Sequence, residues 1–96
     1  MKTNQHNNHG SNADAAKNEL STLCISTAIK FRLGQEASAS QQFRECINLL
    51  EPLLKNHHNA VNIMKILPEI LASQEKHDWI CLADYLEYEL PILLKN

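Results

Sequence analysis

Four long stretches of this chain repeat apolar side chains every three or four residues, and this repeat constrains the fold more than any other feature. The stretches cover residues 13–33, 36–56, 58–75 and 78–94, and short polar connections separate them. Such a repeat places the apolar side chains on one side of an α-helix. The chain has only two glycines and three prolines, so it has little of the turn chemistry that a β-rich fold needs. The sequence therefore predicts an all-α protein.

Short connections between helices make consecutive helices antiparallel. The predicted fold is an antiparallel up-down-up-down four-helix bundle, built as a single domain over residues 12–96. Residues 1–11 are rich in Asn and His and contain little that can be buried, so we expect a disordered polar tail there. If the first helix is partly detached, the alternative is a three-helix bundle with an N-terminal helical arm.

Local residue chemistry predicts where these helices end and bend. Gly34 fits the position just after the first helix, where a left-handed residue closes the last turn. Asp78 fits the N-cap of the last helix. The apolar repeat continues on both sides of Pro52, so we expect a kink in the second helix rather than its end. Pro68 is expected to bend the third helix.

The apolar repeat also predicts which residues face the core. In the first helix these are Ala16, Leu20, Leu23, Cys24, Thr27 and Phe31. In the second helix they are Ala39, Phe43, Cys46, Ile47, Leu50, Leu53 and Leu54. In the third helix they are Ala60, Val61, Met64, Leu67, Ile70 and Leu71.

The last helix carries more apolar surface than one core contact needs. Its first stripe consists of Trp79, Leu82, Leu86, Leu90 and Leu93. A second stripe lies roughly 130° away at 100° per residue, and it consists of Cys81, Tyr85, Tyr88 and Ile92. Two interpretations remain open. The helix packs against two neighbours at once, or the second stripe is an interface, since tyrosine often anchors protein contacts.

The first helix gives the same signal, because Ile25 and Ile29 lie away from its main stripe. Asp84 and Glu87 flank the second stripe of the last helix and would guide a partner by charge. The predicted partner is a protein, either a second copy in a homodimer or an unidentified helical partner. The predicted partner-binding residues are Cys81, Asp84, Tyr85, Glu87, Tyr88, Ile92, Ile25 and Ile29.

Composition argues against several other partners. The net charge is −2 and no segment is rich in lysine or arginine, so nucleic acid is not an expected partner. No stretch approaches the roughly 20 apolar residues that a membrane span needs. No signal-peptide pattern is visible, and the three cysteines form no C-x-x-C pair. We expect a cytoplasmic protein in a reducing environment.

The chain lacks the motifs of the common catalytic and metal-binding helical bundles. It contains no Glu-x-x-His and no His-Glu-x-x-His sequence, and two glycines cannot form a glycine-rich phosphate loop. The sequence therefore predicts no enzyme, no cofactor and no metal site. The alternative is a small ligand-binding or enzymatic bundle that uses His57, His58 or His77 with a carboxylate.

The segment DWICLADYLEYEL resembles a pattern of small bacterial all-helical proteins of unassigned function. That pattern reads Asp, an aromatic residue, two variable residues, Leu-Ala-Asp, one variable residue and Leu-Glu-Tyr-Glu-Leu. The chain matches it at Asp78, Trp79, Leu82, Ala83, Asp84, Leu86, Glu87, Tyr88, Glu89 and Leu90. The resemblance implies a bacterial source and an all-helical fold, and no activity. A looser architectural likeness to flagellar export chaperones implies a non-enzymatic adaptor or chaperone-like module.

Overall fold

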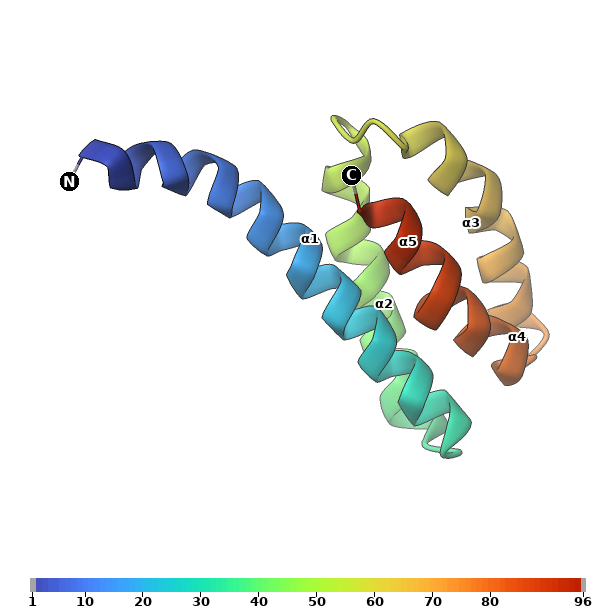
Figure 1. Ribbon diagram of the computed structural model, residues 1–96. Helices are drawn as coiled ribbons and strands as arrows, with labels where there is room; N and C mark the ends of the chain where they lie inside the picture. Colours follow the sequence, from blue (N-terminus) through green and yellow to red (C-terminus); the bar gives the residue numbers. More distant parts are fainter. Residues whose placement is uncertain (1, 96) are drawn as a thin grey trace.

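The computed structural model describes the backbone of residues 2–95 and the side chains of residues 15–95. Its elements are α1 (Lys2–Arg32), α2 (Glu36–Leu54), α3 (Ala60–Glu75), α4 (Trp79–Asp84), the π-helical turn η1 (Tyr85–Glu89) and α5 (Leu90–Leu94). The last three are continuous, and we call them the C-terminal rod. Consecutive helices run in opposite directions, and no strand occurs in residues 2–95 (Figure 1). The all-α four-helix fold is therefore confirmed.

The C-terminal rod occupies the middle of the bundle (Figure 1). It packs against α1 on one side and against α3 on the other, and α1 also packs along α2. Residues from Leu20 to Phe31 of α1 contribute to the core. This part of α1 is therefore a full member of the bundle.

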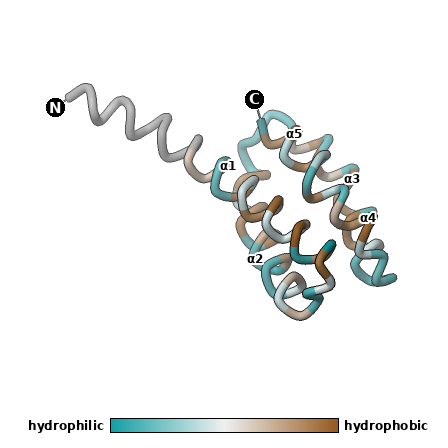
Figure 2. The backbone as a smooth tube through the Cα atoms, turned by 60° about the horizontal axis from the view of Figure 1, so that its bottom comes forward, coloured by the Kyte–Doolittle hydropathy of each residue, from teal (hydrophilic) through white to brown (hydrophobic). Residues whose placement is uncertain are grey.

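The core contains most of the apolar residues predicted for the first two helices; Ala16 is only half-buried, and Ala28 is buried although it was not predicted. Figure 2 shows apolar residues recurring along α1, with hydrophilic residues between them. The buried apolar residues of the two helices are Leu20, Cys24, Ala28, Phe31, Ala39, Phe43, Cys46 and Leu50. Thr27 is also fully buried, and its hydroxyl donates a hydrogen bond to the Leu23 carbonyl at 2.7 Å. This bond removes the penalty of burying an unpaired hydroxyl.

The helix ends follow the predicted local chemistry. Gly34 has a φ of 81°, and the next residue, Gln35, donates its N–H to the Lys30 carbonyl at 2.9 Å. The same closure ends α3, where His77 has a φ of 58° and the Asp78 N–H reaches the Ser73 carbonyl at 2.9 Å. Asp78 then caps α4, because its carboxylate accepts a hydrogen bond from the Cys81 N–H. Gly34 and Asp78 have the roles that the sequence predicts.

Some helix bounds differ from the expected ones. α1 begins at Lys2, so its backbone includes residues for which the sequence predicts a tail. Met1 lies outside the described residues, and the boundary between tail and domain stays a prediction. α2 continues past Pro52 to Leu54, and Pro68 lies inside α3, so neither proline ends its helix at once.

The orientation of α3 corrects the predicted inward face. Ile70 is fully buried as predicted, and Ala60 and Leu67 are half-buried. Val61, Met64 and Leu71 were expected in the core and are exposed, whereas Ile63, which was not predicted to face inward, is fully buried. Two apolar stripes run along this helix, and the periodicity does not decide between them. The stripe that packs inward ends in the polar Ser73, whose hydroxyl donates a hydrogen bond to the Cys81 sulfur at 3.2 Å. This contact gives the buried Ser73 hydroxyl a partner where α3 packs against the rod.

Two adjacent residues of α3 test this orientation. Ile63 is fully buried, whereas the Met64 side chain is 58% exposed. Ile63→Ala should lower the free energy of unfolding by about 2–5 kcal/mol, because it leaves a cavity in the core. Met64→Ala should change it by no more than about 0.5 kcal/mol. Urea denaturation of both variants checks this difference, and equal losses would contradict the orientation.

Candidate partner-binding surface

The C-terminal rod buries every fourth residue: Leu82, Leu86, Leu90 and Leu94. In an α-helix four residues turn through about 400°, so a repeat of four drifts by about 40° at each step. The wide turn η1 compensates for this drift, since the Leu90 N–H donates to the Tyr85 carbonyl five residues earlier. The π-helical turn therefore keeps all four leucines on the core side.

Pro91 explains why the wide turn occurs at this place. Proline has no N–H to donate to the carbonyl four residues earlier, which here belongs to Glu87, and its ring crowds that carbonyl. The turn before Pro91 therefore lacks one α-helical hydrogen bond, so less is lost when this turn becomes π-helical. The π-helical turn ends at Glu89, two residues before the proline.

This change of phase divides the second apolar stripe that the sequence predicts for the last helix. Cys81 and Tyr85 are half-buried and face α3, where they contact Ser73 and Glu69. Tyr88 and Ile92 are 57% and 64% exposed. The four residues were expected on one surface because a uniform 100° per residue was assumed. The structure places two of them against α3 and two at the outer surface.

The exposed residues of α1 and the rod come together across the helix contact. Ile25 lines one groove with Tyr88 and Ile92, and the hollow has a volume of about 330 Å³. Ile29 follows one turn along α1 and is 47% exposed. We call Ile25, Ile29, Tyr88 and Ile92 the partner surface. The structure thus joins the surplus apolar residues that the sequence shows separately on the first and last helices.

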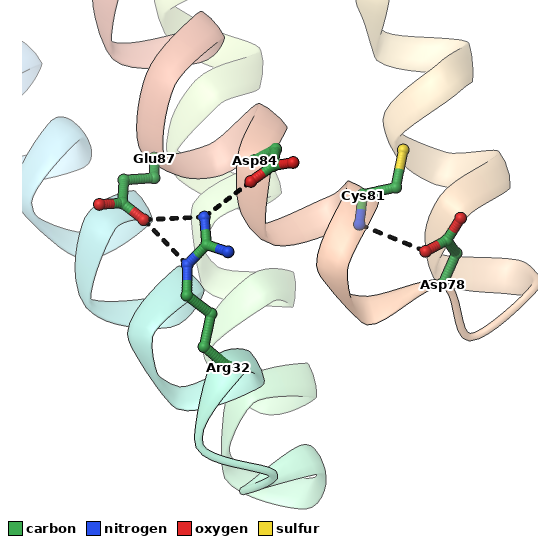
Figure 3. A network of polar contacts seen from close by, with 5 residues as sticks. All are labelled: Arg32, Asp78, Cys81, Asp84 and Glu87. Carbon is green, nitrogen blue, oxygen red and sulfur yellow. Dashed lines mark hydrogen bonds and ion pairs between the residues drawn. The ribbon is translucent and has the colours of Figure 1, made fainter.

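The predicted charged guides already have a partner within the chain. Arg32 at the end of α1 bonds Asp84 at 2.8 Å and Glu87 at 2.9 Å (Figure 3). Hydrogen bonding to Asp84, and then to Glu87, raises the pKa of the Arg32 guanidinium. One cation neutralises one of two carboxylates, so the trio keeps a net charge of −1. The sequence analysis missed Arg32, because its partners are more than 50 residues away.

The histidines of the alternative hypothesis have structural contacts. The Asn59 N–H donates to Nδ1 of His57 at 3.0 Å, so Nε2 carries the proton and donates to the Leu94 carbonyl at 3.1 Å. His58 stacks on His57, and His77 stacks on Trp79. Among the side chains of residues 15–95, no hydrogen bond or ion pair joins one of these histidines to a carboxylate.

The three cysteines are free thiols. Cys24 and Cys46 are buried where α1 meets α2, and the Cys46 sulfur lies 3.6 Å from the Thr27 hydroxyl. Hydrogen bonding to Cys46, followed by burial, raises the pKa of the Cys24 thiol. A raised pKa disfavours the reactive thiolate, so Cys24 acts here as a small apolar residue.

Comparison of the chain with protein-family models, with curated proteins and with solved structures finds no match. The resemblance of its last helix to small bacterial helical proteins therefore stays a prediction. No helix of the described residues is both long and apolar enough to cross a membrane. Within the same residues, no group of three His, Cys, Asp or Glu side chains lies close enough together to hold a metal ion.

Tyr85 provides a test of the contact between the rod and α3. Its hydroxyl donates a hydrogen bond to the Glu69 carboxylate, and this bond raises the pKa of the phenol to about 12. The fold thus favours the protonated phenol. The resulting stabilisation is complete below the ordinary pKa of about 10, and it is lost as the pH rises through about 12.

Tyr88→Phe leaves Tyr85 as the single tyrosine of the chain. Absorbance of the phenolate should then show one titration near pH 12. Adding Glu69→Gln removes the acceptor charge and should move this titration down toward about 10. An unchanged midpoint in the double variant would show that Glu69 does not hold the Tyr85 hydroxyl.

Proposed function

We propose that this protein is a non-enzymatic protein-binding module that holds an amphipathic helix of another protein along the partner surface. One observation carries the proposal. Ile25 from α1 and Tyr88 and Ile92 from the rod are exposed apolar side chains that line one groove. Residues so far apart in sequence meet there only because the bundle brings their helices side by side.

The chemistry of the groove fits a helix. Helix-binding grooves take apolar side chains spaced by three and four residues, and neighbouring grooves on two packed helices present such pockets. Tyr88 offers a large ring with few rotatable bonds, which is the type of residue that anchors protein contacts. Exposed apolar side chains also gain free energy when a partner removes them from water.

The charges around the groove favour a basic segment in the partner. Glu87 lines the groove and belongs to the Arg32 trio, whose Asp84 side chain is 57% exposed. The trio keeps a net charge of −1, so it attracts a cation at this end of the groove. Lys95 lines the groove as well and would attract an acidic residue. Such charges orient the partner and speed association more than they add affinity.

Other functions have less support. His57 donates a hydrogen bond to the Leu94 carbonyl at the end of the rod. Among residues 15–95 no histidine is paired with a carboxylate, so no group of residues there favours an enzyme. The net charge is −2 and no segment is rich in lysine or arginine, so nucleic acid is not a favoured partner. The free thiols are consistent with a reducing cytoplasm as the place of action. Self-association through this surface is the second candidate, and the experiment below separates it from binding of another protein.

The test places a photo-reactive phenylalanine derivative at Tyr88 and, as a control, at the exposed Gln41 on α2. Irradiation in cells should give crosslinked products from position 88 that position 41 does not give. Ile25→Asp should remove these products because it puts a charge into the groove. Leu49→Asp, a matched change on α2, should leave them unchanged.

Crosslinks to a second copy alone would favour self-association over a separate partner. Identical products from positions 88 and 41, or products that persist with Ile25→Asp, would contradict the proposal. Mass spectrometry of the products gives the identity of the captured chain and the position of the crosslink in it. The melting temperature of each variant checks that the bundle is intact.

A further inference from the structure

The outer face of α3 carries an apolar stripe that the bundle does not cover. Val61, Met64 and Leu71 are exposed by 67%, 58% and 43%, and the exposed Pro68 lies between the last two. Their spacing of three, four and three residues is the spacing of the seam between two packed helices. The stripe points about 130° away from the buried Ile63 and Ile70, at 100° per residue. No helix of the described chain packs on this side of α3 (Figure 1).

The charges beside the stripe are self-complementary. Lys65 and Glu69 lie on the same flank of the stripe. The position midway between them is residue 67, and the middle of the stripe is residue 66. The Lys65 ammonium has no hydrogen bond or ion pair within residues 15–95. Glu69 accepts one hydrogen bond from Tyr85 through Oε1, so its other oxygen is available. The opposite flank carries Leu67 and Gln74 and has no charge to oppose a close approach.

These two features define how a second copy would fit. A two-fold axis between residues 66 and 67 reverses the second helix and keeps each flank on its own side. Lys65 of each copy then lies beside Glu69 of the other, and the two apolar stripes face each other. A parallel two-fold arrangement would instead place the Lys65 and Glu69 flank of each copy beside the uncharged flank of the other, so no charge pair would form. The stripe and its charges therefore match a second copy in antiparallel orientation.

We propose that the outer face of α3 is a self-association interface, on which the α3 helix of a second copy packs antiparallel about a two-fold axis. The interface uses Val61, Met64, Pro68 and Leu71 as its seam, and it uses two reciprocal Lys65–Glu69 pairs on one flank. It leaves Ile25, Ile29 and Tyr88 of the partner surface uncovered, whereas Ile92 lines a groove with Lys65 at the edge of the interface. The dimer would thus present two copies of the partner surface, and this inference does not depend on what that surface binds.

Sedimentation velocity of the full chain over a concentration series tests the seam. The wild type should show a monomer–dimer equilibrium. Met64→Asp should weaken it by about a hundredfold, because the charge lies at the centre of the contact. Leu49→Asp places the same charge at an exposed apolar position of α2 and should leave the dissociation constant unchanged. A wild type that stays monomeric at millimolar concentration, or equal weakening by both variants, would overturn the proposal.

The charge pairs give a second test that does not depend on the seam. Lys65→Glu alone places four acidic residues together in the dimer, and Glu69→Lys alone places four basic residues there. Each variant should weaken its own self-association by about tenfold. Mixed in equal amounts, the two variants should form a heterodimer about as strong as the wild-type dimer, because opposite charges meet at both ends. A mixture that associates no better than either variant alone would overturn the antiparallel arrangement.

Variants of the partner surface separate this proposal from the proposed function. Ile25→Ala with Tyr88→Ala, which lie on the groove between α1 and the rod and not on the groove that Lys65 lines, should leave the dissociation constant of the dimer within about twofold of the wild type. Loss of the dimer in this variant would place the self-association interface on the partner surface and overturn the assignment to α3. Circular dichroism of every variant checks that the helix content is retained.

Discussion

The packing of the C-terminal rod between α1 and α3 is the constraint on which the rest of the structure depends. The rod must keep Leu82, Leu86, Leu90 and Leu94 in the core over its whole length. A regular α-helix cannot hold a repeat of four on one side, so the rod contains a π-helical turn that ends two residues before Pro91. The same proline that interrupts the α-helical hydrogen bonds therefore helps the rod to fit its groove.

The surfaces of the bundle follow from this packing. The change of phase in the rod turns Cys81 and Tyr85 toward α3, and it leaves Tyr88 and Ile92 beside Ile25 of α1. Arg32 links α1 to the rod through Asp84 and Glu87 next to this groove. An exposed ion pair adds little stability, typically less than about 1 kcal/mol, so its main effect is on the charge at this end of the groove. The opposite edge of the bundle, formed by α3, carries a separate apolar stripe.

The sequence predicts well those features that depend on neighbouring residues. Gly34 and Asp78 have the expected roles, because a left-handed residue and a capping carboxylate act within one turn of a helix. The inward face of α3 was predicted correctly at Ile70 but wrongly at Val61, Met64 and Leu71, since that helix has two apolar stripes and only the packing against the rod selects one. The π-helical turn rotates the residues that follow it relative to those before it, and a helical wheel with a uniform 100° per residue does not account for this rotation. Arg32 was missed because its partners come from a distant helix.

The most direct test of this account is the solvent exposure of individual isoleucine methyl groups. Isoleucines occur in the core of α3, on α1 and on the rod, so one spectrum reports on all three. Methyl NMR of a dilute sample with a soluble paramagnetic agent measures this exposure. The account predicts strong relaxation enhancement at Ile25 and Ile92 and weak enhancement at Ile63 and Ile70. An Ile92 methyl as protected as that of Ile63 would contradict the arrangement of the rod and the surface derived from it.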